Sequence, residues 1–116
     1  MINGINSREM ILEILLEIEE GEHSHVAIRN ALSKYQFLPK QDRAFITRVC
    51  EGTLEYRIQI DYIINSFSKV TVDKMKPAIR EILRSAVYQL KYMDSVPDSA
   101  VCNEAVKLAQ RKGFYN

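Results

Sequence analysis

The sequence contains few of the residues that interrupt helices. Its 116 residues include four glycines and three prolines, the residue types least favourable inside a helix. The one Asn-Gly dipeptide, Asn3-Gly4, lies in the N-terminal tail and not between alternating apolar runs, where it would predict a β-hairpin. Long helices joined by short connections are therefore expected.

The sequence also has no long unbroken apolar run. The apolar segment from Ile11 to Ile18 is interrupted by Glu13 and Glu17, and the first six residues carry no basic side chain. A membrane span needs a continuous apolar stretch, and a signal peptide needs one after a positively charged start. We therefore expect neither of them, and a cytoplasmic location for the chain.

Groups for catalysis or metal binding are scarce. The four glycines are isolated from one another, so no glycine-rich turn is available to hold a cofactor. Cys50 and Cys102 stand among apolar neighbours, where a buried, reduced and unreactive thiol is expected. His23 and His25 lack further ligands at zinc spacing, so a solvated loop is expected there. The chain itself is not expected to be a catalyst.

Length and composition indicate one folded domain. A chain of 116 residues can bury a core without disulfides or metal. Its 47% hydrophobic and 27% charged residues are ordinary values for a globular protein. Because the sequence shows no internal repeat and no flexible linker, residues 1–116 are expected to form a single domain.

Apolar residues recur at helical spacing in six segments, which predicts an all-α fold. Asn6 or Ser7 caps the first helix and Gly21 ends it, while Ser24 is the expected N-cap of the second. Pro77 suits the first turn of the longest helix. The expected helices are Ser7–Glu20, Ser24–Tyr35, one that begins near Lys40 to Asp42 and reaches Leu54, Ile58–Phe67, Pro77–Met93, and one from Pro97 to a stop at Gly113.

Two side-chain expectations follow for these helices. Gly52 lies inside the third helix at a cost of roughly 1 kcal/mol against alanine, so another helix is expected to approach it closely. The apolar residues of the fourth and fifth helices are expected to face the core, among them Phe67 and Leu90.

The formal net charge of +1 hides an uneven distribution. Six glutamates occur up to Glu22, against the single base Arg8, which is expected to balance local charge. Nearly all of the positive charge lies further along the chain, where a basic face can form.

The longest predicted helix carries a stripe of bases at spacings of four or seven. Its members are Lys76, Arg80, Arg84 and Lys91, with Tyr88 beside them. Such a stripe can contact phosphates, and a tyrosine can stack on an unpaired base. These five side chains are therefore candidate RNA contacts. The alternative is a solvated helix flank in which Glu81 and Asp73 supply the opposite charge.

A second basic set lies on the third predicted helix. Its candidate RNA contacts are Lys40, Arg43 and Arg48, followed by Arg57. Asp42, Glu51 and Glu55 dilute the positive charge of this set. The sequence leaves open whether the two basic sets share one face of the molecule.

Three segments resemble bacterial rRNA methyltransferases of the RsmB (Sun/Fmu) type. The first is Asn-Ser-Arg-Glu at residues 6–9, followed by an apolar helix. Residues 42–63 are similar to the family's block DR-x-F … GTL-x-x-R … LD. Residues 82–109 are similar to LR-x-x-x-YQL … VP … NEAV-x-LA, the most specific of the three. The resemblance spans almost the whole chain.

This resemblance implies a NusB-like fold, in which two antiparallel three-helix bundles pack together and take part in RNA recognition. In such enzymes this domain precedes a Rossmann-type domain, which binds S-adenosylmethionine and methylates a small-subunit rRNA cytosine at C5. Residues 1–116 are then a fragment that has no cofactor of its own. Its expected partners are rRNA and the parent's methyltransferase domain. The family pattern continues beyond Gly113 into one more helix.

Two alternatives stay open. The first is a standalone NusB, which binds a boxA RNA with a ribosomal protein and supports transcription antitermination. NusB uses an arginine-rich N-terminus for its RNA, whereas residues 1–8 contain one base, and Gln89 also resembles the methyltransferase form. The second alternative is a helical module that binds mainly protein and whose charges are solvated.

Overall fold

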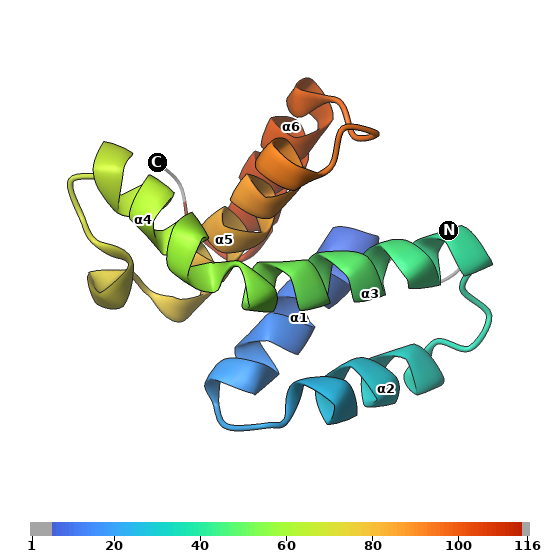
Figure 1. Cartoon of the computed structure of the whole chain (residues 1–116). Coiled ribbons are helices and arrows are strands. Elements are labelled where there is room, and N and C mark those ends of the chain that lie inside the picture. Colours follow the sequence, from blue (N-terminus) through green and yellow to red (C-terminus); the bar gives the residue numbers. More distant parts are fainter. Residues whose placement is uncertain (1–5, 115–116) are drawn as a thin grey trace.

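The computed structural model describes residues 6–114, which form six α-helices and one 3-10 helix, with no strand among them (Figure 1). The predicted all-α fold is confirmed; the Asn3-Gly4 pair lies outside the described residues. The elements are α1 (Ser7–Glu19), α2 (Ser24–Lys34), α3 (Lys40–Glu55), α4 (Arg57–Phe67), η1 (Val72–Lys74), α5 (Pro77–Tyr92) and α6 (Asp98–Arg111). Across residues 6–114, no helix has both the length and the apolar character needed to cross a membrane.

Most of the helix ends lie where the sequence predicts them. The Asn6 side chain accepts a hydrogen bond from the backbone N–H of Glu9 at 2.8 Å, as an N-cap does. Gly21 ends α1 with a φ of +115°, a conformation that favours glycine. Ser24 differs from the prediction: it is already the first residue of α2, so its hydroxyl does not cap the helix, and His23 occupies the capping position.

α5 is the central helix of the bundle. It packs against α1, α3, α4 and α6, while α1, α2 and α3 also pack against one another. α4 and α6 both lie on α5 (Figure 1). The chain therefore forms two groups of three helices that meet along α5.

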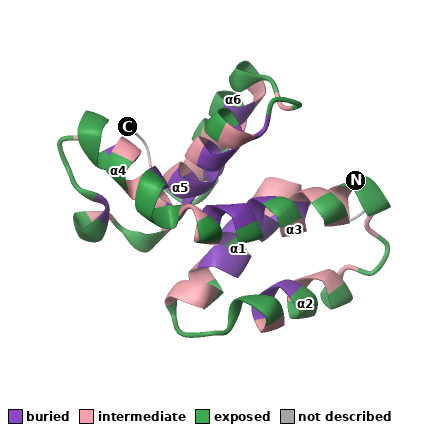
Figure 2. Ribbon diagram, in the orientation of Figure 1, coloured by how far each residue is buried: buried purple, intermediate pink, exposed green. Residues whose placement is uncertain are grey.

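The main core lies between α1, α3 and α5, with α2 and α4 closing its sides. Its largest fully buried side chains are Met10, Ile11, Ile14, Leu15, Ile46, Val49 and Ile60. A smaller cluster of Leu12, Ile82 and Leu108 joins α1, α5 and α6. Burial is concentrated in α1 and α5, whereas α4 and α6 are green or pink over much of their surface (Figure 2).

Several side chains that were predicted to be buried are exposed. Phe67 of α4 is 88% exposed and Leu90 of α5 is 40% exposed. Cys102 of α6 is exposed as well, whereas Cys50 is buried as expected. These predictions were wrong because helical spacing identifies an apolar face but not whether another helix covers it. α4 and α6 each pack on α5 with only part of their apolar surface.

The close approach expected at Gly52 is confirmed. A Cβ atom placed there would overlap the ring of Tyr88, so this ring of α5 packs directly on the backbone of α3. Tyr88 stacks on Tyr92 with ring centroids 5.4 Å apart, and Tyr92 stacks on Tyr56 at 4.5 Å. Gly52 therefore sets the separation of the two helices and the position of three rings.

We expect Gly52→Ala to destabilise the domain. Alanine normally stabilises a helix by about 1 kcal/mol relative to glycine. Here the added methyl group must displace the buried Tyr88 ring, which costs about 1–3 kcal/mol. Urea denaturation measures the change in the free energy of unfolding. Combined with Tyr88→Leu, the loss should be smaller than the sum of the two single losses, because the overlapping ring is gone. A more stable Gly52→Ala variant would contradict the close contact.

Candidate functional site

Two of the candidate bases, Arg80 and Arg84, face the interior of the bundle. Arg84 is only 8% exposed. Its guanidinium donates hydrogen bonds to both carboxylate oxygens of Asp61 at 2.8 and 2.9 Å, and a third to Glu81 at 2.6 Å. Two-point contacts of this kind are among the strongest between charged side chains. Arg84 therefore ties α5 to α4.

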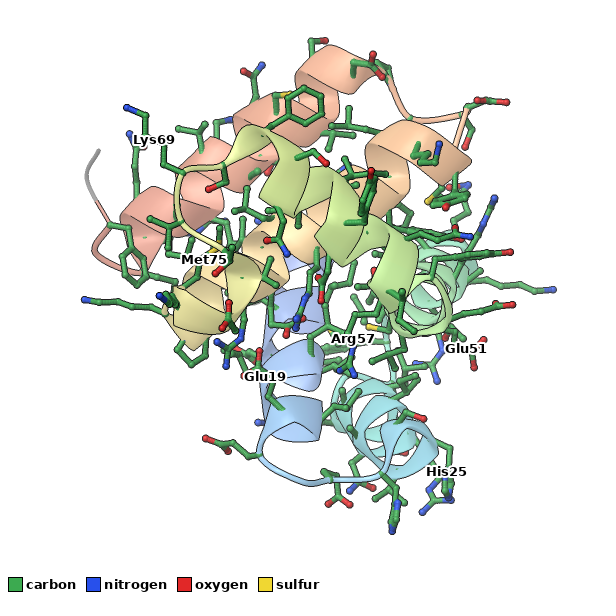
Figure 3. All side chains as sticks on the ribbon, turned by 60° about the vertical axis from the view of Figure 1, so that its left-hand side comes forward. Glu19, His25, Glu51, Arg57, Lys69 and Met75 are labelled. Atoms are coloured by element: carbon green, nitrogen blue, oxygen red, sulfur yellow. The ribbon has the colours of Figure 1, made fainter. Side chains whose placement is uncertain are left out.

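Arg80 makes the equivalent contact with the end of α1. Its Nε and Nη2 atoms donate to the two carboxylate oxygens of Glu19 at 2.7 and 2.6 Å. Its Nη1 atom donates to the Met75 carbonyl at 2.9 Å. Figure 3 shows Glu19 at the end of α1 and Met75 in the segment before α5. Arg80 thus holds both segments against α5.

Glu81 completes this cluster of buried charges and is 3% exposed. Burial, together with a hydrogen bond with Glu19, raises the pKa of Glu81 to about 8. Hydrogen bonds from Arg80 lower the pKa of Glu19 to about 2. At neutral pH the cluster therefore holds two guanidinium ions, the carboxylates of Glu19 and Asp61, and a protonated Glu81. The opposite charges balance, which limits the cost of burying them.

The prediction of an exposed basic stripe along α5 is therefore wrong for the central residues of the helix. Arg80 and Arg84 are paired with carboxylates, and Tyr88 is 5% exposed, so these three offer little surface to an RNA. The physical reason is that four helices surround α5, which leaves no continuous side of it in solvent. The sequence signal for this was Glu81, an acid placed between two arginines on a helix with apolar flanks.

The two remaining candidates of α5, Lys76 and Lys91, are exposed at its opposite ends. The Lys76 ammonium lies 5.5 Å from the centre of the Phe114 ring, and the Lys91 ammonium lies 5.7 Å from that of Tyr92. The length of α5 separates them by roughly 22 Å, so they do not form one contact surface. Their contact with RNA stays a prediction.

The second basic set lies together on α3. An open hollow of about 570 Å³ runs along the outer side of this helix. The residues that line it are Lys40, Arg43, Ala44, Thr47, Arg48, Glu51, Gly52, Glu55 and Tyr88. The structure thus gathers the three α3 candidates and an edge of Tyr88 at one surface, hereafter the α3 hollow.

The three bases of the α3 hollow differ in how far they are engaged. Arg43 donates from Nη1 to two carbonyls near the end of α2, at 3.0 and 3.3 Å, and so satisfies that helix end. Arg48 donates one hydrogen bond, of 3.3 Å, to the Tyr92 carbonyl, and its side chain is otherwise exposed. Lys40 is exposed at the first position of α3. Lys40 and Arg48 therefore keep donors available to a ligand.

The buried cysteine of α3 is not suited to nucleophilic catalysis. Burial raises the pKa of the Cys50 thiol far above its usual range, which keeps it protonated and unreactive. Within residues 6–114, no three His, Cys, Asp or Glu side chains lie close enough to hold a metal ion. The α3 hollow can bind an anionic group through Lys40 and Arg48.

Comparison with known proteins gives a family from the sequence and a shared fold from the structure. A model described as the NusB family matches residues 5–115. The "Probable ribosomal RNA small subunit methyltransferase B" of Bacillus subtilis (strain 168) is 31% identical over 106 residues, which are 91% of this chain and 24% of that protein. This chain therefore spans about a quarter of the length of that relative.

A second relative is matched over most of its own length. The "Transcription antitermination protein NusB" of Acetivibrio thermocellus is 31% identical over 106 residues, 90% of this chain and 72% of that protein. Among solved structures, a chain of "Antitermination Factors NusB and NusE in complex with dsRNA" superposes with a TM-score of 0.82 at 18% identity. That superposition covers 91% of this chain and 80% of the other, and shows that the fold is shared.

We expect Arg84→Ala to destabilise the domain strongly, by about 3 kcal/mol, because it leaves the partly buried Asp61 carboxylate and the buried Glu81 without the guanidinium that binds them. The exposed Lys76→Ala should change stability by less than about 0.5 kcal/mol. Thermal unfolding followed by circular dichroism compares the two. Equal stability of both variants would mean that Arg84 is not the tie between α4 and α5.

The protonated state of Glu81 makes stability depend on pH. Because its pKa is raised from 4.5 to about 8 on folding, its contribution is fully present below pH 4.5 and is lost as the pH rises through 8. The free energy of unfolding should therefore fall over this range. Glu81→Gln, which cannot ionise, should show a flatter profile in urea denaturation at several pH values. Identical slopes for the two proteins would rule out a protonated Glu81.

Proposed function

This chain belongs to the NusB family, and from that premise we propose that it is a non-catalytic RNA-binding domain. The observation that carries the proposal is the α3 hollow, where the bases Lys40, Arg43 and Arg48 outnumber the two exposed acids Glu51 and Glu55. The printed names of the relatives support the ligand class, since they refer to ribosomal RNA, to antitermination and to a complex with double-stranded RNA.

Other surfaces of the domain suit RNA less well. The outer side of α1 exposes Glu13, Glu17 and Glu20, which would repel phosphates. The arginines of α5 are already paired with carboxylates. Phosphate contacts supply most of the affinity in protein–nucleic acid complexes and need accessible bases. The α3 hollow is therefore the proposed contact surface, with Arg43 holding α2 in place beside it.

At a finer level, we propose that the domain is the N-terminal part of a small-subunit rRNA cytosine-C5 methyltransferase. The match to the Bacillus subtilis methyltransferase and the sequence Tyr88-Gln89-Leu90 support this. S-adenosylmethionine does not fit the described residues. Gly21 and Gly113 end helices and Gly52 packs on Tyr88, so none of them forms a cofactor loop. The cofactor and the reaction would belong to the parent's methyltransferase domain, in the cytoplasm.

The second candidate is a standalone antitermination factor of the NusB type. The observation in its favour is coverage, because the alignment takes in 72% of the Acetivibrio thermocellus NusB. The gene sequence after Asn116 separates the two candidates. A downstream glycine-rich cofactor loop and a Pro-Cys dipeptide would support the methyltransferase; their absence would support the standalone factor.

If the α3 hollow binds RNA, removing its two exposed bases should weaken RNA binding. Lys40→Ala with Arg48→Ala should weaken binding to a small-subunit rRNA fragment at least about tenfold at low salt. It should also reduce the slope of log K against log salt by about 1.4, since each phosphate contact to a single strand contributes about 0.7. Fluorescence anisotropy at several salt concentrations measures both quantities.

The matched control is Arg29→Ala with Lys112→Ala, which removes the same two charge types from exposed positions outside the α3 hollow. The control should keep the slope of the unchanged protein. Two results would reject the proposal: no binding of the unchanged protein at low salt, or the same loss in both double variants.

A further inference from the structure

A second hollow lies where the beginning of α4 meets the end of α5. It measures about 630 Å³ and is lined by Ile58, Gln59, Tyr62, Ile63 and Lys91. Ile58 and Tyr62 are one helical turn apart, so they lie on the same side of α4. Tyr62 is 75% exposed, and its ring is therefore accessible to a ligand. This site is hereafter the Tyr62 hollow.

The lining of the Tyr62 hollow combines apolar surface with positive charge. Two isoleucines and the tyrosine ring supply the apolar part, Lys91 supplies the charge, and none of the described residues that line the hollow is acidic. The one acid within residues 56–63, Asp61, has both carboxylate oxygens bound by Arg84. The hollow therefore suits a ligand that carries a flat apolar group beside a negative charge, as a nucleotide does.

Tyr92 connects this hollow to the α3 hollow. Its hydroxyl donates a hydrogen bond of 2.6 Å to Gln59, which lines the Tyr62 hollow. Its carbonyl accepts a hydrogen bond of 3.3 Å from Arg48, which lines the α3 hollow. Its ring also stacks on Tyr88, another residue of the α3 hollow. Tyr92 thus contacts residues of both hollows, which places the two sites side by side.

We propose that an unpaired base of the bound RNA stacks on Tyr62 while Lys91 contacts an adjacent phosphate. This inference rests on the proposed RNA binding and specifies a single-stranded ligand. Bases in a duplex stack on one another, whereas unpaired bases are free to stack on aromatic side chains. The strand would run from Lys40 and Arg48 in the α3 hollow, across Tyr92, to Lys91.

A nucleotide fits the Tyr62 hollow better than a protein segment does. An apolar side chain of a partner could cover the isoleucines, but it would bring no negative charge to Lys91. A second copy of this chain that met the hollow with its own would bring two such lysines together. A stacked base with its phosphate matches both parts of the lining.

Tyr62→Ala tests the stacking contact. The probe is a single-stranded oligoadenylate of about 12 nucleotides, and its binding is followed by fluorescence anisotropy. The variant should bind at least about fivefold more weakly, as expected when one base loses its aromatic partner. The slope of log K against log salt should not change, because the tyrosine ring is uncharged. Tyr62→Phe keeps the ring and should keep the affinity.

The matched control is Phe67→Ala, which removes another exposed aromatic ring of α4 that does not line the hollow. It should bind the oligoadenylate as the unchanged protein does. Lys91→Ala should instead reduce the salt slope by about 0.7, the contribution of one phosphate contact to a single strand. Circular dichroism should show the same helix content in all of these variants, since every altered side chain is exposed.

A second probe separates base stacking from a general loss of binding. It is a ribose-phosphate chain of the same length that carries no bases. Tyr62→Ala should bind this chain as well as the unchanged protein does, because no base is present to stack. Lys40→Ala with Arg48→Ala should weaken binding to both probes, because the phosphates are the same in both.

Four outcomes would overturn the stacking site. In the first, the unchanged protein does not bind oligoadenylate at low salt, although stacking accepts every base. In the second, Tyr62→Ala leaves the affinity unaltered while Lys40→Ala with Arg48→Ala lowers it, a result that keeps the proposed function. In the third, Tyr62→Ala weakens both probes equally. In the fourth, sedimentation shows a dimer that Tyr62→Ala abolishes, which would assign the hollow to a second copy. Conversely, a loss in Tyr62→Ala with none in the α3 double variant would support the stacking site and reject the α3 hollow.

Discussion

The structure depends on the buried pairing of Arg84 with Asp61 and Glu81, beside that of Arg80 with Glu19. These contacts join α5 to α4 and α1, and they lie where a purely apolar core would be easier to build. Their burial is tolerable because protonation of Glu81 leaves two positive and two negative charges. One proton therefore decides whether the centre of the bundle is neutral.

This central position of α5 divides the surface into regions with different uses. Because Arg80 and Arg84 of α5 form ion pairs inside the bundle, accessible positive charge lies mainly on α3 and at the helix ends. The outer side of α4 is left apolar, and that of α1 acidic.

The sequence was sufficient for features that depend on neighbouring residues. The cap at Asn6, the stop at Gly21 and the start near Pro77 follow from local backbone chemistry. It failed where contacts join distant residues. Nothing in the spacing of Arg80 and Arg84 shows that Glu19 and Asp61 lie within reach. Likewise, an apolar Phe67 at helical spacing cannot show whether another helix covers it. Lys40, Arg43 and Arg48 were grouped correctly because one helix carries all three.

The contact between Gly52 and Tyr88 has a kinetic consequence for the α3 hollow. Both residues line the hollow, so this part of its surface is a ring of α5 packed on the backbone of α3 rather than a loop. A surface of this kind does not need to rearrange when a ligand arrives. For the proposed RNA contact, encounter would then be governed by diffusion and long-range attraction. Ionic strength would act on encounter by screening that attraction, and on the bound complex through the phosphate contacts of Lys40 and Arg48.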